Sequence, residues 1–169
     1  PHTGVYGRCN DCLFEYNVMR RVLYETIDSG AFYVGRSWAE RGNVFQHNTI
    51  DDVRAYQRLA QTYSRQNAFY LDDQMSGWTF FNNTVINAST AVKLGGGRRN
   101  LILNNTFLDC DEDVAFDNRG MAWSWQTEYC SPTCAHSTGR NCFAGVLAGL
   151  NYTSPPYSTA YPYLVEIFN

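Results

Sequence analysis

Four stretches of the chain share one residue pattern. In each, an apolar residue is followed three positions later by Asn, then two positions later by a second apolar residue, and three positions after that by a small or apolar one. The asparagines are Asn17, Asn48, Asn83 and Asn105, and the last two are 22 residues apart. Repetition at roughly 20 to 50 residues on short apolar runs is typical of a solenoid. The pattern predicts an all-β parallel β-helix in which each repeat is one coil.

A second register begins on alanine, at Ala31, Ala68, Ala91 and Ala115. In a β-helix the four asparagines would stack, so that each amide bonds its copy one coil away. The alternative is a β-sandwich, but sandwich strands are joined by hairpin turns, and the chain has no Asn-Gly or Asp-Gly pair. The steps of 31 and 35 residues between Asn17, Asn48 and Asn83 predict loops inserted into a shorter coil.

Composition predicts one domain over residues 1–169, with regular coils over 4–124 and an irregular segment rich in Cys, Tyr and Pro over 125–169. The chain is 44% hydrophobic, which is enough for one core. A formal net charge of -3 argues against nucleic acid as a partner. No apolar run approaches the ~18 residues of a membrane span. Because open ends of a solenoid expose strand edges, we expect a segment of a longer protein or self-association through those ends.

The cysteines are even in number, which favours disulfides in a secreted chain. They are Cys9, Cys12, Cys110, Cys130, Cys134 and Cys142. A zinc site is the alternative, since the two closest pairs have permissible spacing. Four Asn-x-Ser/Thr sequons favour secretion instead, at Asn82, Asn87, Asn104 and Asn151. The sequence therefore predicts a secreted, disulfide-linked protein carrying N-linked glycans, with Asn82 and Asn104 pointing outward beside the asparagine ladder.

Candidate chemistry lies on the outer face of the second register. Strand alternation turns the apolar residues inward and their neighbours outward. The inward set is Phe32, Val34, Phe69, Leu71, Val92, Leu94 and Phe116. The outward set forms two columns, the first Tyr33, Tyr70, Lys93 and Asp117, the second Gly35, Asp72, Gly95 and Arg119. Tyrosine rings stack on sugars and charged groups bind hydroxyls and carboxylates, so this face predicts a polysaccharide site.

Asp72 and Asp117 are the candidate catalytic pair. Their expected separation falls in the window of inverting glycosidases. Lys93 could instead act as a base beside a uronate carboxylate. Asp28 is a candidate third acid and Arg36 a candidate substrate ligand. An acidic stretch at residues 109–113 offers oxygen ligands for calcium, but it lacks a defined ligand spacing, so a solvated turn is the favoured interpretation and no cofactor is expected.

Several strings resemble one family. They are GAFYVGRSWAERGNVF, FYLDDQMSGWTFFNNT, KLGGGRRNLILNNTF and FDNRGMAW. They are similar to secreted right-handed parallel β-helix proteins of the pectin-lyase-like superfamily, and within it to glycoside hydrolase family 141, with fucosidase and xylanase activities. This resemblance covers about residues 4–124. It implies a carbohydrate-active enzyme, with Asp28, Asp72 and Asp117 as the residues that carry the activity.

Two functions are consistent with the sequence. One is a secreted glycoside hydrolase or polysaccharide lyase. The other is a non-catalytic extracellular module that binds glycans or assembles end to end into a matrix or filament. The polar outer column favours the first, and the dense sequons favour the second.

Overall fold

The computed structural model describes residues 3–37, 40–58, 61–117 and 165–168. Within these ranges the chain forms strands and no helix. Sheet A contains β1 (Val5–Tyr6), β4 (Gly30–Gly35), β9 (Asn67–Asp72), β12 (Thr90–Gly95) and β15 (Glu112–Asp117). Sheet B contains β2 (Leu13–Glu15), β5 (Asn43–Gln46), β10 (Trp78–Phe81), β13 (Asn100–Leu103) and β16 (Val165–Phe168). Sheet C contains β3 (Val18–Arg20), β6 (Thr49–Asp51), β11 (Thr84–Ile86) and β14 (Thr106–Leu108).

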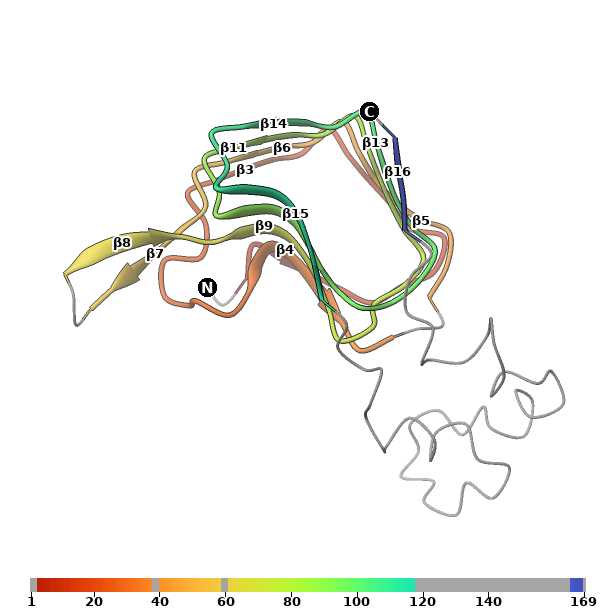
Figure 1. The fold of residues 1–169 in the computed structure, drawn as a ribbon, viewed down its shortest axis with the longest axis horizontal. Coiled ribbons are helices and arrows are strands. Elements are labelled where there is room, and N and C mark those ends of the chain that lie inside the picture. The colour runs from red at the N-terminus through yellow and green to blue at the C-terminus, as the bar shows by residue number, and fades with distance from the viewer. Residues whose placement is uncertain (1–2, 38–39, 59–60, 118–164, 169) are drawn as a thin grey trace, which may run out of the picture.

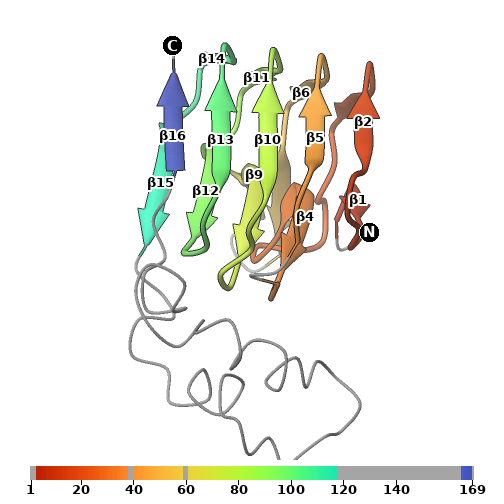
Figure 2. The ribbon, with the colours of Figure 1, turned by 90° about the vertical axis from the view of Figure 1, so that its right-hand side faces the viewer.

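The chain visits the three sheets in the same order each time. One repeat is a strand in sheet A, then one in sheet B, then one in sheet C, and the next repeat lays its strands parallel to these (Figures 1 and 2). The predicted all-β class and parallel pairing are therefore confirmed, and the arrangement is compatible with a parallel β-helix. The last repeat includes β16, which pairs with β13.

Two insertions lengthen the same connection, from sheet C to sheet A. Between β11 and β12 this connection is only residues 87–89, whereas between β3 and β4 it covers residues 21–29. Between β6 and β9 it contains an antiparallel hairpin, β7 (Arg54–Gln57) and β8 (Thr62–Arg65), which projects from the three sheets (Figure 1). These insertions account for the longer steps in the sequence pattern.

The core lies between the three sheets and is mostly aromatic and aliphatic. Phe45 and Phe80 from sheet B meet Phe32 and Phe69 from sheet A, with ring centroids 4.6 to 6.4 Å apart. Trp78 is fully buried among them. Burying an apolar side chain of this size stabilises a fold by about 1.5 to 3 kcal/mol, so these rings dominate the energetics of the interior.

The predicted asparagine ladder is confirmed. The side-chain Nδ2 of Asn17 donates to Oδ1 of Asn48 at 2.9 Å, Asn48 to Asn83 at 3.2 Å, and Asn83 to Asn105 at 3.0 Å. Each Oδ1 also accepts the backbone N–H of the preceding ladder residue, at 2.8 to 2.9 Å. One side chain thus satisfies both the amide stack and the backbone where the chain turns from sheet B to sheet C.

The residue before each ladder asparagine takes the left-handed conformation. Tyr16, His47, Asn82 and Asn104 have φ between 50° and 56°. A single left-handed residue turns the chain sharply, and non-glycine residues seldom adopt it unless the surroundings hold it there. The ladder hydrogen bonds from the next residue provide that support.

A second set of buried asparagines begins two strands of sheet B, which the sequence pattern did not reveal. Asn43 accepts the Cys12 N–H at 3.1 Å and donates to the Cys9 carbonyl at 2.8 Å. Asn100 accepts the Trp78 N–H at 3.2 Å and donates to the Met75 carbonyl at 2.9 Å. Trp78 occupies the equivalent position in the repeat between them. Asparagine therefore does not recur at this position in every repeat, and the sequence pattern does not reveal it.

One register prediction is wrong at the last strand of sheet A. Lys93 pairs with Ala115 and Gly95 with Asp117. Ala115 therefore lies two residues further along its strand than the alanines of the other repeats lie along theirs, which are Ala31, Ala68 and Ala91. A shift of two keeps each side chain on its expected face, because strands alternate with period two. Phe116 pairs with Leu94 as an inward residue, yet it is 48% exposed because β15 is the edge strand of sheet A.

The disulfide that the structure shows lies at the N-terminal end, between Cys9 and Cys12. Cys110 has a free, half-buried thiol. Burial raises the pKa of this thiol, because the charged form is poorly solvated there. Cys130, Cys134, Cys142 and the rest of the expected irregular segment 125–164 lie outside the described residues.

Replacing Asn83 with Leu should lower the free energy of unfolding by about 1 to 3 kcal/mol, because it leaves the buried Asn48 N–H and amide without their acceptor. Asn17→Leu is the matched control. Asn17 is exposed, and its replacement removes only the side-chain donor to Asn48 Oδ1, which still accepts the backbone N–H of residue 17. Chemical denaturation measures both variants. Equal losses would show that the amide stack contributes nothing specific.

Glu40 gives the fold a pH dependence of known sign. Its carboxylate accepts hydrogen bonds from Trp78 Nε1 and Asn43 Nδ2, each at 3.3 Å, and lies 3.7 Å from Arg8. Burial raises the pKa of Glu40, only partly offset by the Trp78 bond and the Arg8 charge. A raised folded-state pKa stabilises the fold at acidic pH, and this contribution is lost as pH rises from the unfolded pKa through the folded one.

Glu40→Gln should therefore remove part of the pH dependence. From about pH 4 to about pH 7, the unfolding free energy of the variant should gain on that of the wild type. Denaturant titrations of both proteins at several pH values measure the difference. A difference that stays constant with pH, or moves toward the wild type, would contradict this assignment.

Candidate functional site

The outer face of sheet A carries an aromatic column. Tyr6 pairs with Tyr33, Tyr33 with Tyr70, Tyr70 with Lys93 and Lys93 with Ala115, so these residues occupy one register across the sheet. The Tyr6 and Tyr33 rings are stacked with centroids 6.1 Å apart, and Tyr6 is 59% exposed. Sequence reasoning did not include Tyr6, because β1 is two residues long and lacks the alanine that marks the register.

Tyr70 lies beneath its neighbours. It is only 2% exposed, with the edge of Tyr33 at 5.4 Å and the Lys93 ammonium 4.7 Å above its ring. A cation over an aromatic face is stabilising, and here it belongs to the protein itself. The predicted stacking of Tyr70 on a sugar does not fit this burial. Tyr33 and Tyr6 are the rings of this column that face outward.

A second column alternates glycine with aspartate. Gly35 pairs with Asp72, and Gly95 pairs with Asp117. Leu71 pairs with Leu94, so the residues that follow them, Asp72 and Gly95, are aligned with each other in the same register. The order across the sheet is therefore Gly35, Asp72, Gly95, Asp117. The two-residue shift of β15 brings Asp117 into this column, whereas the sequence placed it beside Lys93.

Gly95 leaves the space between the two aspartates without a side chain. Two strand spacings of about 4.8 Å place the Asp72 and Asp117 backbones roughly 9.6 Å apart. The sequence predicts a larger separation, because it also places the two residues two positions apart along the strand. The pair flanks Gly95, which is buried and places no side chain between the two residues.

The Asp72 carboxylate is held by hydrogen bonds from its own surroundings. Oδ2 accepts the Tyr33 hydroxyl at 2.7 Å, Oδ1 accepts the Asp73 N–H at 3.0 Å, and the residue is 8% exposed. Burial, the hydrogen bond to Asp72 and the Asp72 charge together raise the pKa of Tyr33 above its ordinary value. Tyr33 therefore stays protonated at neutral pH and acts as a hydrogen-bond donor. Its predicted role in binding becomes one of orienting Asp72 as well.

Arg36 lies at the edge of this site and is already paired. Its Nε donates to Asp73 Oδ2 at 3.0 Å, and the side chain is otherwise exposed. Its backbone carbonyl accepts a hydrogen bond from the Arg8 guanidinium. The Asp73 hydrogen bond and charge raise the pKa of Arg36, which is a cation at any physiological pH. Arg119, the other predicted basic ligand, lies outside the described residues.

Asp28 does not join the pair. It is exposed in the insertion before β4, whereas the Gly35 partner of Asp72 ends that strand. Seven residues of extended chain separate Asp28 from Gly35, which is about 23 Å. The sequence correctly placed Asp28 next to a strand but at the wrong end for a third acid at this site.

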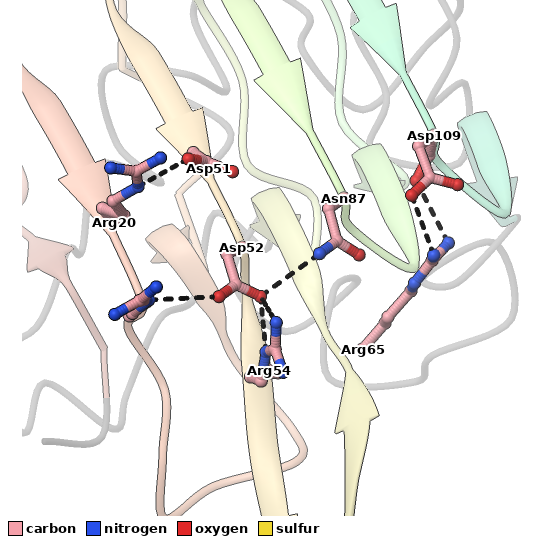
Figure 3. A network of polar contacts seen from close by, with 8 residues as sticks. Arg20, Asp51, Asp52, Arg54, Arg65, Asn87 and Asp109 are labelled. Carbon is pink, nitrogen blue, oxygen red and sulfur yellow. Dashed lines mark hydrogen bonds and ion pairs between the residues drawn. The ribbon is translucent and has the colours of Figure 1, made fainter.

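Networks of ion pairs and hydrogen bonds stabilise the corner between sheets C and A. Asp52 is paired with Arg21 at 3.5 Å and with Arg54, and it accepts the Asn87 amide at 3.3 Å (Figure 3). Arg20 bonds Asp51 at 2.6 Å. These charges are internal partners of one another, so they stabilise the corner rather than offer a site.

The acidic stretch proposed for calcium is likewise engaged. Arg65 bonds Asp109 at 3.0 Å and Asp111 at 2.9 Å (Figure 3 draws the first pair). Among residues 3–37, 40–58 and 61–117, no group of three or more His, Cys, Asp or Glu side chains is arranged to hold a metal ion.

Three of the four sequons fall on described residues. Asn82 and Asn104 are exposed in left-handed turns, as expected for acceptors beside the ladder. Asn87 is partly buried and its amide donates to Asp52. Asn151 lies outside the described residues.

Comparison with family models, with characterised proteins and with solved structures finds no match to this chain. Over its described portion, the chain contains no helix with the length and hydropathy needed to cross a membrane.

Proposed function

We propose that this protein is a secreted, N-glycosylated right-handed parallel β-helix that hydrolyses a polysaccharide, with Asp72 and Asp117 as its catalytic pair. The observation that carries the proposal is the Gly35, Asp72, Gly95, Asp117 column on the outer face of sheet A. The repeating passage through three parallel sheets and the asparagine ladder support the β-helix. The resemblance to glycoside hydrolase family 141 agrees with both.

The separation favours an inverting reaction. Inverting glycosidases hold their two carboxyl groups roughly 6.5 to 9.5 Å apart so that a water fits beside the sugar, and two strand spacings give a comparable distance. A shorter separation of about 5 Å, which a retaining enzyme needs, would require carboxylates on adjacent strands. Gly95 occupies the intervening strand and places no side chain between the two carboxyl groups.

The surroundings assign a role to each acid. Asp72 accepts two hydrogen bonds, from Tyr33 and from the Asp73 backbone, which hold its carboxyl group in one orientation. Asp72 is therefore the general base that removes a proton from the attacking water. Asp117 is the general acid that protonates the glycosidic oxygen as its bond to the anomeric carbon breaks. Tyr6 provides an exposed ring on which a neighbouring sugar stacks.

A non-catalytic role is the second candidate, and exposed apolar residues on edge strands favour it. Leu13 on β2 and Val18 on β3 are 55% and 72% exposed. Edge strands with apolar side chains are templates for pairing with another chain. On this alternative the protein assembles end to end into a matrix or filament, and the outer column binds glycans without cleaving them.

Asp72→Asn and Asp117→Asn should each reduce turnover by at least about 10²-fold, the usual contribution of general acid or base catalysis. The assay is release of reducing ends from a panel of plant and animal polysaccharides, with unsaturated uronates recorded to detect a lyase reaction. Asp73→Asn is the matched control, because Asp73 is paired with Arg36, and it should retain most activity.

Full activity in both variants would place the site elsewhere. A wild-type protein that binds polysaccharide but releases neither product across the panel would favour the non-catalytic role.

Glycan occupancy tests the secreted assignment independently. In native material, mass spectrometry should find sugar on Asn82 or Asn104, because both side chains are exposed. Asn87 should be occupied to a lower degree, since its amide bonds Asp52 at the corner network. Unmodified peptides at all three positions would contradict passage through a glycosylating compartment.

A further inference from the structure

The two insertions between sheets C and A form one surface. They occur in consecutive repeats at the same corner, and the Tyr56 N–H of β7 donates to the Tyr24 carbonyl of the 21–29 segment at 3.0 Å. Neither insertion belongs to the repeating pattern. Insertions that project from one side of a repeat protein commonly form its binding face.

Three tyrosines gather on this surface, which we call the tyrosine face: Tyr24, Tyr56 and Tyr63. They are 37%, 43% and 50% exposed. The Tyr63 ring lies 6.0 Å from Tyr24, nearly perpendicular to it, and 5.2 Å from Tyr56. Tyr56 and Tyr63 are cross-strand partners in the hairpin, while the adjacent Ala55 is fully buried. Strand alternation therefore holds both rings on the outward side of the hairpin.

Two arginines beside the tyrosine face are already neutralised. Arg54 lies 5.6 Å from the Tyr63 ring centre and is paired with Asp52. Arg65 is paired with Asp109 and Asp111. A charged ligand would have to compete with these carboxylates or guanidinium groups. The face instead offers exposed rings and phenolic hydroxyls, which suit an uncharged ligand with apolar faces and many hydroxyl groups.

We propose that the tyrosine face binds neutral carbohydrate by stacking, as a second contact with a polysaccharide chain. The inference deepens the proposed function, but binding here does not require Asp72 or Asp117. The hairpin leads into β9 at Asn67, whereas Asp72 ends that strand. Five residues of extended chain span about 17 Å from Asn67 to Asp72, so the length of β9, a span of several sugar residues, lies between the two sites. The tyrosine face would thus hold the polymer while the outer column acts on it.

Affinity electrophoresis of the whole protein through gels containing neutral arabinoxylan or mixed-linkage β-glucan tests this directly. The wild type should be retarded. Tyr63→Ala should weaken binding by about 3- to 10-fold, the loss expected for one aromatic contact. Tyr63→Phe should retain most of the retardation, because the ring is kept. A gel containing polygalacturonate reports whether an anionic polymer binds instead.

Two controls separate this site from others. Tyr16→Ala removes a tyrosine that is more exposed than Tyr63, 72% against 50%, on the corner between sheets B and C, and it should leave retardation unchanged. Asp72→Asn should abolish hydrolysis yet keep retardation, so failure of the catalytic proposal leaves this one standing. Thermal denaturation confirms that each variant is folded.

Three results would overturn the inference. One is free migration of the wild type in both neutral gels, and another is equal retardation of Tyr63→Ala and wild type. The third is concentration-dependent self-association, measured by sedimentation, that Tyr63→Ala removes without any effect on polysaccharide binding, because the face would then contact a second copy of the chain.

Discussion

The asparagine ladder is the interaction on which the other features depend. Each ladder amide joins one repeat to the next through its side chain and, through its oxygen, bonds the backbone of the previous repeat. A buried amide that lost these partners would cost about as much as several ordinary hydrogen bonds return. The bonds therefore fix where each repeat turns from sheet B to sheet C. Once that corner is fixed in all repeats, the strands on either side have only one register.

Because the register is fixed, residues at equivalent positions of successive repeats form columns across each sheet. Residues far apart in the chain, such as Tyr33 and Tyr70, become neighbours across sheet A because β4 and β9 pair in register. Connections between sheets are free to differ as long as the strands return to register. The longer insertions accordingly occur between sheets C and A, away from the ladder corner. The proposed carboxylate pair and the tyrosine face lie at opposite ends of the strands that this arrangement aligns.

The sequence revealed the parts of the fold that repeat. Asn17, Asn48, Asn83 and Asn105 recur with the same neighbours, so the ladder and the inward face of sheet A could be predicted. It did not reveal features that appear once. β15 carries Ala115 at the position where the neighbouring strands carry Lys93 and Tyr70, and only the strand pairing shows this register. Burial of Tyr70 depends on Lys93 folding over its ring, and the tyrosine face depends on a hairpin with no Asn-Gly turn.

The same reasoning explains why the candidate site differs from its prediction in position but not in kind. Alternation determines which face a side chain occupies, and this survives any shift of two residues. Asp117 therefore remained an outward carboxylate when its column changed. The column determines its neighbours, and there the shift mattered: Asp117 lies beside Gly95, which has no side chain, instead of beside Lys93. A proposed catalytic pair on parallel strands thus depends on register more strongly than on the identity of either residue. The even spacing of strands sets the separation of the two carboxylates in steps of about 4.8 Å, so that one intervening glycine strand suits an inverting geometry and none would suit a retaining one.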